Sequence, residues 1–227
     1  MARIAEDLGL LLLDNASAQP ALDRPRHERV LSAAVLLDLA HACRIRLAVD
    51  SEPVEAGRLL VLSGPDPADP VMAPALSLLL RRPITPAMAI AKLRRATPAA
   101  VLWQLEHSGQ IQRVRLQTKG LRRPRAWPLV DRTRVTAIRA AMMSALFDDD
   151  RPDPPTAAMI SLLYTVGGLG AVLSLNDRGW EWVLSRAGDI ASGSWVRESE
   201  PDLAEVNLAV TTAAIRVALK YHPPEPE

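Results

Sequence analysis

Two consecutive segments of the chain begin with the same dipeptide, Thr-Pro, at residues 85–86 and 97–98. A threonine hydroxyl at the N-cap accepts a hydrogen bond from an amide of the first turn, and proline fits the next position because its missing amide hydrogen has no partner there. Gly109 ends the second segment and suits the residue that follows a helix. The sequence therefore predicts two short helices in succession, over residues 85–96 and 97–108.

Helices are predicted along most of the remaining chain. Ala and Leu dominate the composition, and both lose little side-chain freedom in a helix. Apolar residues recur at three- and four-residue spacing in residues 27–43, which is the period of one helix face. Residues 156–175 are very apolar and contain Gly167-Gly168, which indicates a buried helix pair or a broken helix. The other predicted helices cover residues 2–15, 71–82, 131–147, 177–190 and 202–222.

The predicted β elements are short. Residues 44–50 alternate apolar and polar side chains, and residues 57–64 are their candidate partner strand. Residues 105–131 run from a helix end through Gly109 into an alternating, arginine-rich stretch that ends with Pro and Trp127. This order predicts a basic β-hairpin.

The fold class is predicted to be mainly α, a compact multi-helix single domain with a short β element and one protruding β-hairpin. The 227 residues are enough for one large domain or two small ones, and 48% of them are apolar, which is enough for a sizeable core. No internal repeat or change of composition marks a boundary. We therefore expect one domain over residues 1–221 and a flexible tail over residues 222–227.

The net charge of +1 conceals a strong segregation along the chain. Residues 1–80 hold 7 Lys/Arg and 11 Asp/Glu, residues 81–139 hold 14 and 2, and residues 140–227 hold 6 and 13. A central third this basic favours negatively charged partners. The alternative is that its arginines pair with the acidic thirds in the folded protein.

No catalytic or metal-binding arrangement is found in the sequence. The four histidines are scattered, and none has a second His or Cys at metal-ligand spacing. There is neither a Gly-x-Ser-x-Gly elbow nor a phosphate-binding loop. Cys43 is the single cysteine, so an intrachain disulfide is impossible. We therefore expect a protein that is not an enzyme and that binds no cofactor or metal.

The early apolar run at residues 8–13 is far shorter than the roughly 20 residues of a membrane-spanning helix. Acidic residues stand where a signal peptide would be basic. The expected location is therefore cytoplasmic.

A winged-helix DNA-binding protein is one interpretation of the basic hairpin. In that fold residues 97–108 would be the recognition helix, but Gln104 is its only side chain suited to reading base edges, and Trp103 is predicted to pack inward. Specific DNA recognition is therefore not expected. Non-specific nucleic-acid binding stays an alternative, as does a cytosolic scaffold whose arginines pair with its own acidic residues.

A second interpretation comes from a series of motifs along nearly the whole chain. An acidic pair precedes a leucine run that ends in aspartate, and a later helix ends in Asp-Leu-Ala, followed by a small residue, Arg, an aliphatic residue and an alternating strand. In this order the chain resembles the Golgi phosphoprotein 3 family. The motifs are Glu6-Asp7, Leu10–Asp14, Asp38–Ala40, Cys43–Leu47, the segment 105–111, the helix over 128–146 and the apolar segment 156–173.

The resemblance implies a peripheral membrane-binding adaptor without catalytic activity. Eukaryotic members of the family bind phosphatidylinositol 4-phosphate on the cytosolic face of membranes and recruit the tails of membrane proteins, and their hairpin contributes to self-association. For this chain we accordingly expect an anionic, phosphoinositide-like lipid partner, membrane-protein tails and a homo-oligomer formed through the hairpin.

The site residues implied by the resemblance are only partly present. A membrane-inserting tryptophan of the family falls near Leu22, which becomes the predicted membrane contact. An arginine of the headgroup site falls at Ser32, and Arg29 stands one turn earlier. Of two further arginines, the first falls on Arg95 and the second on Pro98. The predicted headgroup-binding residues are Arg95, Arg94, Arg29, Arg82 and Arg81, within a wider basic face that includes Arg24, Arg26 and Lys92.

The predicted oligomerisation hairpin contributes both charge and apolar surface. Its arginines are expected to lie on its rim or to face lipid, and its tryptophan is expected to pack against the hairpin or at an interface. The predicted residues are Arg113, Arg115, Leu116, Leu121 and Trp127, together with Arg122, Arg123 and Arg125.

Overall fold

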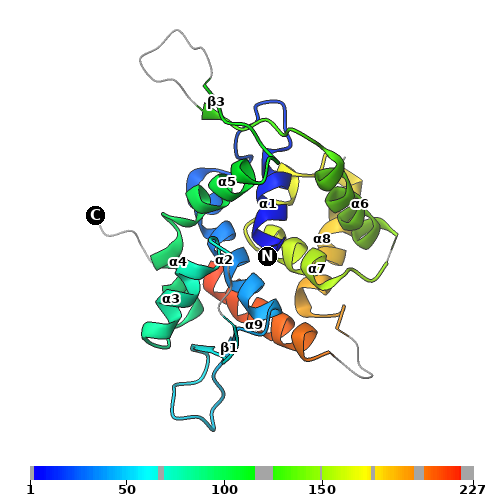
Figure 1. Ribbon diagram of the computed structural model, residues 1–227. Coiled ribbons are helices and arrows are strands. Elements are labelled where there is room, and N and C mark those ends of the chain that lie inside the picture. Colours follow the sequence, from blue (N-terminus) through cyan, green and yellow to red (C-terminus); the bar gives the residue numbers. More distant parts are fainter. Residues whose placement is uncertain are drawn as a thin grey trace, which may run out of the picture.

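The computed structural model describes residues 3–65, 69–115, 125–148, 150–174, 177–196 and 202–220. Within these ranges the chain forms nine α-helices, one short 3-10 helix and two two-stranded antiparallel sheets (Figure 1). The predicted fold class, mainly α with small β elements, is confirmed. The predicted tail at 222–227 lies outside the described residues.

The helices agree with the predicted segments to within a few residues at each end. The helices are α1 (Arg3–Leu13), α2 (Arg24–His41), α3 (Ala73–Arg81), α4 (Pro86–Leu93), α5 (Thr97–His107), α6 (Thr133–Phe147), α7 (Pro154–Thr165), η1 (Leu169–Ala171), α8 (Asp177–Ser192) and α9 (Leu203–Lys220).

Two predicted helix starts are wrong in detail. Thr85 caps α4 as predicted, since its hydroxyl accepts a hydrogen bond from the Met88 amide at 3.3 Å. Thr97, however, is the first residue of α5 rather than its cap, and its hydroxyl donates to the Leu93 carbonyl at the end of α4. The helix predicted over 27–43 begins earlier, at Arg24, because the Asp23 carboxylate caps it.

Helix α2 is the centre of the fold. Every residue from Val30 to Ala40 is buried, so this helix has no solvent-facing side along more than two turns. Helices α1, α5, α7 and α9 pack around it (Figure 1). Burial on all sides explains why the segment is apolar nearly throughout rather than along a single stripe.

Helix α1 is attached to α2 through a buried carboxyl group. The Asp38 side chain accepts hydrogen bonds from the Ile4 amide at 2.8 Å and from the Ala5 amide at 3.0 Å. These amides belong to the first turn of α1, which has no hydrogen-bond partners within its own helix. Asp38 therefore caps α1 from a neighbouring helix.

Gly9 allows α1 to approach α5 closely. A Cβ atom at this position would lie 3.0 Å from Val101 Cγ1 and 3.4 Å from Leu105 Cδ1. The first distance is tighter than an ordinary contact, so with a side chain here Val101 would have to shift by a few tenths of an ångström. A glycine in the middle of α1, where it has no conformational advantage, is explained by this packing.

The apolar segment after residue 153 is a broken helix, as predicted. All residues of α7 from Thr156 to Leu163 are buried. Gly167 has φ +64°, which is a left-handed backbone that ends the helix, and η1 follows it.

Both predicted β elements are present. Strands β1 (Ile45–Leu47) and β2 (Leu59–Val61) pair antiparallel, with Arg46 opposite Leu60. At the base of the basic hairpin, β3 (Val114–Arg115) pairs with β4 (Arg125–Ala126). Figure 1 places this base at the edge of the helical body, next to α5. The turn, residues 116–124, lies outside the described residues.

Raising the pH from 7 to 9 is expected to lower the free energy of unfolding by about 1 kcal/mol. Burial raises the pKa of Asp38 to about 8, and this outweighs the two amide hydrogen bonds, which lower it. The folded protein therefore holds a proton that the unfolded chain releases above its ordinary pKa of 3.8. This stabilisation is complete below that value and is lost as the pH rises through 8. Urea denaturation at the two pH values measures the difference.

The variant Asp38→Asn is the matched control, because it cannot titrate but keeps one oxygen as an acceptor. Its loss of stability between pH 7 and 9 should be smaller than that of the wild type by the same amount. An equal loss in both proteins would contradict the assignment to Asp38.

Candidate functional site

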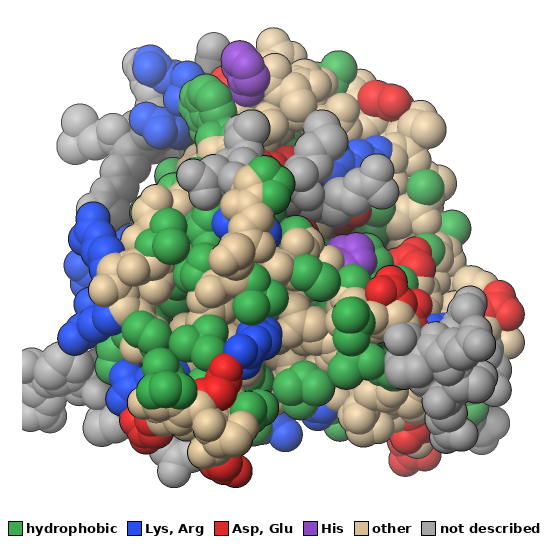
Figure 2. Space-filling model, turned by 60° about the horizontal axis from the view of Figure 1, so that its bottom comes forward, with side chains coloured by type: hydrophobic (Ala, Val, Ile, Leu, Met, Phe, Trp, Pro, Cys, Tyr) green, Lys and Arg blue, Asp and Glu red, His purple; other side chains and the backbone are tan. Residues whose placement is uncertain are grey.

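A group of cations lies at the end of α3, on α4 and in the turns beside it. We call Arg81, Arg82, Lys92, Arg94 and Arg95 the α3–α4 basic surface. Arg94 is half-buried and the other four are exposed. Within the described parts of the chain, none of the five forms an ion pair. Lys and Arg side chains line the left edge of the molecule in Figure 2, on the side where Figure 1 places α3 and α4.

Arg29 adjoins this surface but has a structural role. Its guanidinium donates a hydrogen bond to the Leu219 carbonyl, which ties the start of α2 to the end of α9. Burial lowers the pKa of Arg29, and the positive charge of Arg94 lowers it further. Arg29 and Arg94 are thus close enough to repel each other. The prediction that both belong to one electropositive region is consistent with this repulsion.

The arginines at the other end of the basic third are neutralised. Arg134 contacts Asp7 at 2.6 Å and Glu6 at 3.1 Å, and Arg139 lies 2.9 Å from Asp14. All three carboxylates come from α1 or the residue after it. The alternative expectation, that the basic and acidic thirds pair with each other, therefore holds for this part of the chain.

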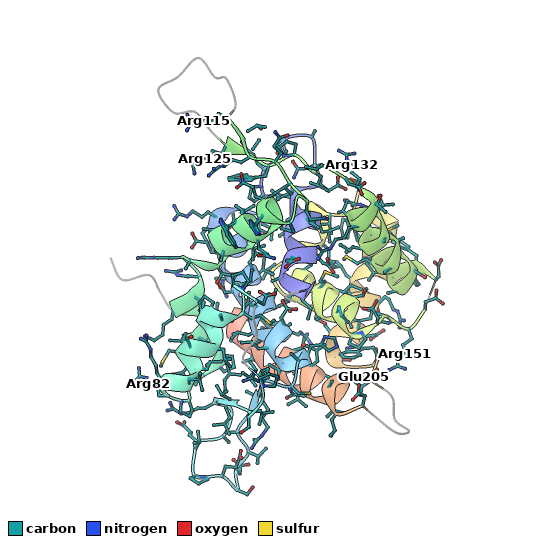
Figure 3. The ribbon with its side chains drawn as sticks, viewed as in Figure 1. Arg82, Arg115, Arg125, Arg132, Arg151 and Glu205 are labelled. Atoms are coloured by element: carbon teal, nitrogen blue, oxygen red, sulfur yellow. The ribbon has the colours of Figure 1, made fainter. Side chains whose placement is uncertain are left out.

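The cations at the base of the hairpin form a separate group. Figure 3 places Arg115 and Arg125 at the top of the molecule and Arg82 at the lower left. Arg113 lies 3.6 Å from Glu106, whereas Arg115 and Arg125 form no ion pair within the described residues. The central third therefore does not present its charge on a single surface.

The role predicted for the hairpin in self-association stays a prediction. Trp127 is partly buried, and its backbone amide donates to the Ala18 carbonyl at 2.7 Å, so this residue attaches the hairpin base to the loop after α1. Leu116, Leu121, Arg122 and Arg123 lie outside the described residues.

Helices α3–α5 also expose large apolar side chains. Leu80 is 62% exposed, Met88 40% and Trp103 53%. The prediction that Trp103 packs inward is wrong, because Val101 and Leu105 occupy the inner face of α5. Its indole instead stacks on the exposed imidazole of His107, with ring centroids 5.0 Å apart.

Leu22, the predicted membrane contact, is only 7% exposed and belongs to the core. The loop after α1 folds back over the core, and Leu22 lies beside Gly168. This side chain is therefore not presented at the surface. Ser32 is fully buried, and its hydroxyl donates to the Glu28 carbonyl, so no cation replaces the arginine that the family resemblance implies there.

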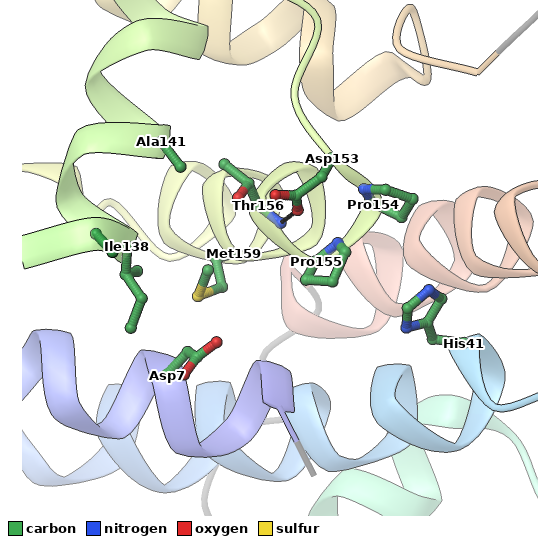
Figure 4. Close-up of a pocket in the computed structure, with 10 residues that line it drawn as sticks. Asp7, His41, Ile138, Ala141, Asp153, Pro154, Pro155, Thr156 and Met159 are labelled. Carbon is green, nitrogen blue, oxygen red and sulfur yellow. Dashed lines mark hydrogen bonds between the residues drawn. The ribbon is translucent and has the colours of Figure 1, made fainter. Parts of the chain in front are cut away.

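A groove with a volume of about 470 Å³ separates α6 from α1 and from the start of α7 (Figure 4). Ile138, Ala141 and Met159 give it apolar walls. Its two carboxylates are already engaged: Asp7 binds Arg134, and Asp153 accepts a hydrogen bond from the Thr156 amide at 2.8 Å. These carboxylates are therefore poorly placed to act on a substrate.

Sequence reasoning did not find this groove, nor the exposed apolar side chains. The groove joins residues that are more than 100 positions apart, and no local pattern indicates that they meet. For Leu80 a signal existed, because it ends a run of three leucines and a helix cannot bury three consecutive side chains on one face.

Across the described ranges, every helix is too short or too polar to cross a membrane.

The protein is expected to bind a sulfonate cation exchanger at pH 7 more strongly than its net charge of +1 suggests. Replacing Arg81 and Arg82 with Gln should lower the salt concentration of elution, because both cations are exposed and neither forms an ion pair with a described residue. The control is Arg46→Gln with Arg58→Gln, which removes the same charge from arginines that are paired with Glu52 and Glu55. Equal shifts of the two variants would contradict a localised surface.

The comparison with known families gives a match over most of the chain. The family model described as Golgi phosphoprotein 3 (GPP34) matches residues 4–206. This range includes α1–α8 and the start of α9, and therefore the basic surface, the hairpin and the groove. Among curated proteins, no sequence matches this chain. On the family match, the chain belongs to the Golgi phosphoprotein 3 family.

Proposed function

We propose that this protein is a non-enzymatic, peripheral membrane-binding adaptor. It binds anionic phospholipid, with a phosphoinositide-like headgroup as the preferred ligand, on the cytosolic face of a membrane. The α3–α4 basic surface provides the contact. Membership of the Golgi phosphoprotein 3 family supports an adaptor-like role, and the surface chemistry supports the lipid.

The observation that carries the proposal is the difference between two sets of cations from the same basic third. Arg134 and Arg139 are bound to carboxylates of the N-terminal third. The α3–α4 basic surface, by contrast, has no ion pair within the described residues. Positive charge that is not neutralised inside the protein is available to an external polyanion.

The arrangement of the surface suits a lipid bilayer. Its cations stand at both ends of α4, a helix of eight residues and therefore about 12 Å long. This separation is longer than the Debye length of about 8 Å at physiological salt, so the two ends would contact a charged plane as two separate groups of cations. The exposed apolar side chains of Leu80, Met88 and Trp103 lie on the same three helices, where they can enter the lipid interface.

The surface of α5 argues against the nucleic-acid alternative. Its most exposed large side chains are Trp103 and His107, which stack on each other, and the helix contains no Arg or Lys. A helix of this composition has little to offer the major groove of DNA. Recruitment of membrane-protein tails and self-association through the hairpin stay predictions within this proposal.

Vesicle flotation tests the proposed lipid contact. The wild type should float with phosphatidylcholine vesicles that contain phosphatidylinositol 4-phosphate, and less so as salt increases. Replacing Arg82 and Arg95 with Gln should weaken binding about thirtyfold, because each basic group near an anionic surface contributes about 1 kcal/mol. Binding constants from a vesicle titration give this ratio.

The control variant Arg46→Gln with Arg58→Gln has the same net charge and should bind like the wild type. Wild-type protein that fails to float at low salt with either phosphoinositide or other acidic vesicles would contradict membrane binding. If it then shifts random duplex DNA in a gel, the nucleic-acid alternative is correct. If it binds neither, the scaffold alternative remains.

A further inference from the structure

Helix α9 has a second apolar face, on the side that points away from the core. Its inner face is buried and includes Leu208 and Ile215. On the opposite face Leu203 is 82% exposed, Val217 63% and Val210 51%. A helix at a protein surface normally carries polar side chains on its outer face. The outer face of α9 is therefore a candidate contact surface.

The outer residues follow the repeat of a coiled coil. They are separated alternately by three and four positions, which keeps their side chains on one line along a helix. We call this line the α9 seam, and it consists of Leu203, Val206, Val210, Ala213 and Val217. Val206 is half-buried and the other four are exposed. The pattern is typical of a helix that packs along a second helix.

The seam offers little to a lipid surface. A helix that lies in a membrane interface carries Lys and Arg on its polar side. The cations of α9 are Arg216 and Lys220, and the Arg216 guanidinium donates to the Ala191 carbonyl and to the Thr165 hydroxyl within the protein. A single cation at the end of an apolar line attracts an anionic membrane weakly, whereas a second apolar helix can cover the line along its whole length.

Polar side chains fix α9 in the body of the protein. The Asn207 side-chain amide donates to the Ala40 carbonyl at 2.7 Å and to the Ile45 carbonyl at 2.8 Å. Glu205 lies 2.9 Å from Arg151. These contacts attach the helix to α2, to β1 and to the loop before α7. The seam is therefore held in position, and a partner can bind it without rearranging the helix.

Two copies of α9 complement each other when they run antiparallel. A two-fold axis at the middle of the helix brings the same surface of both copies together. Val210 then faces Ala213 of the second copy, and Val206 faces Val217. A larger side chain lies against a smaller one at the centre, which suits the interaxial distance of about 8–10 Å between packed helices.

The charges at the two ends of α9 favour this direction. Asp202 precedes the first residue of the helix and Lys220 is its last residue, and both are exposed. Neither forms an ion pair with a described residue. Antiparallel contact places Asp202 of each copy beside Lys220 of the other, whereas parallel contact places the two Lys220 side chains together. The opposed helix dipoles favour the antiparallel direction as well.

We propose that the α9 seam binds a second copy of this chain, as an antiparallel helix pair about a two-fold axis. The five seam residues are fewer than the roughly 20–30 residues a side of a standard interface, so the dimer is weak and reversible. Figure 1 places α9 and β3 at opposite sides of the molecule, so this contact is separate from the self-association predicted for the hairpin. It does not depend on the lipid contact proposed above.

Sedimentation equilibrium of the full chain tests the dimer. Between about 1 µM and about 1 mM the wild type should show a monomer–dimer equilibrium. Val210→Glu with Val217→Glu should raise the dissociation constant about tenfold or more, because the new carboxylates would have to be buried among apolar side chains. The control Met143→Glu with Leu184→Glu adds the same charge at exposed apolar positions of α6 and α8 and should leave the constant unchanged.

Disulfide cross-linking tests the direction of the pair and keeps the seam apolar. The single variants Val206→Cys and Val217→Cys are made in a Cys43→Ser background, so that no other thiol is present. These positions are about 16 Å apart along the helix, whereas a disulfide joins Cα atoms about 5.5–6 Å apart. Oxidation should therefore give a covalent dimer when the two variants are mixed and none when either is oxidised alone.

Three results would overturn the proposal. The first is a wild type that stays monomeric at about 1 mM, and the second is a dimer whose dissociation constant does not change in Val210→Glu with Val217→Glu, which would assign association to the hairpin or to another surface. The third is cross-linking of each cysteine variant alone and not of the mixture, which indicates a parallel pair. If the two glutamates abolish vesicle flotation and leave the mass unchanged, the seam faces lipid and the proposal is equally wrong.

Discussion

The hydrogen bonds from the first amides of α1 to the Asp38 carboxyl group hold α1 against α2. Held against the central helix α2, α1 presents its carboxylates to α6. Glu6 and Asp7 then bind Arg134, and Asp14 binds Arg139. The positive charge of the central third is thereby balanced on the α6 side. Within the described residues, the cations of the α3–α4 basic surface, and Arg115 and Arg125 at the hairpin base, have no such acidic partner.

Much of the fold could be predicted because its signals are local. Thr85 and Gly109 mark helix ends through bonds and backbone angles that involve only nearby residues. Thr97 misled the prediction for a physical reason: α4 and α5 follow each other so closely that its hydroxyl reaches the last turn of the preceding helix. Trp103 could have been placed correctly from sequence. It stands two positions from both Val101 and Leu105, and residues two apart on a helix do not share a face.

The candidate site was predictable in charge but not in arrangement. Segregation along the chain indicates that a basic surface is available, yet it does not say which arginines are neutralised. The pair between Arg134 and Glu6 spans 128 residues, so no local pattern could reveal it. Leu22 shows the same limit, because it is buried beside Gly168 from a distant segment. The family resemblance placed a membrane contact there, and the packing of the loop after α1 removed it from the surface.

The close approach at Gly9 has a consequence for the opposite side of α5. Since no side chain at this position separates the two helices, Val101 and Leu105 pack directly against α1, while the indole and imidazole that stack on each other lie on the outer side of α5. A larger residue at position 9 would therefore disturb the packing beneath the helix that carries these two rings.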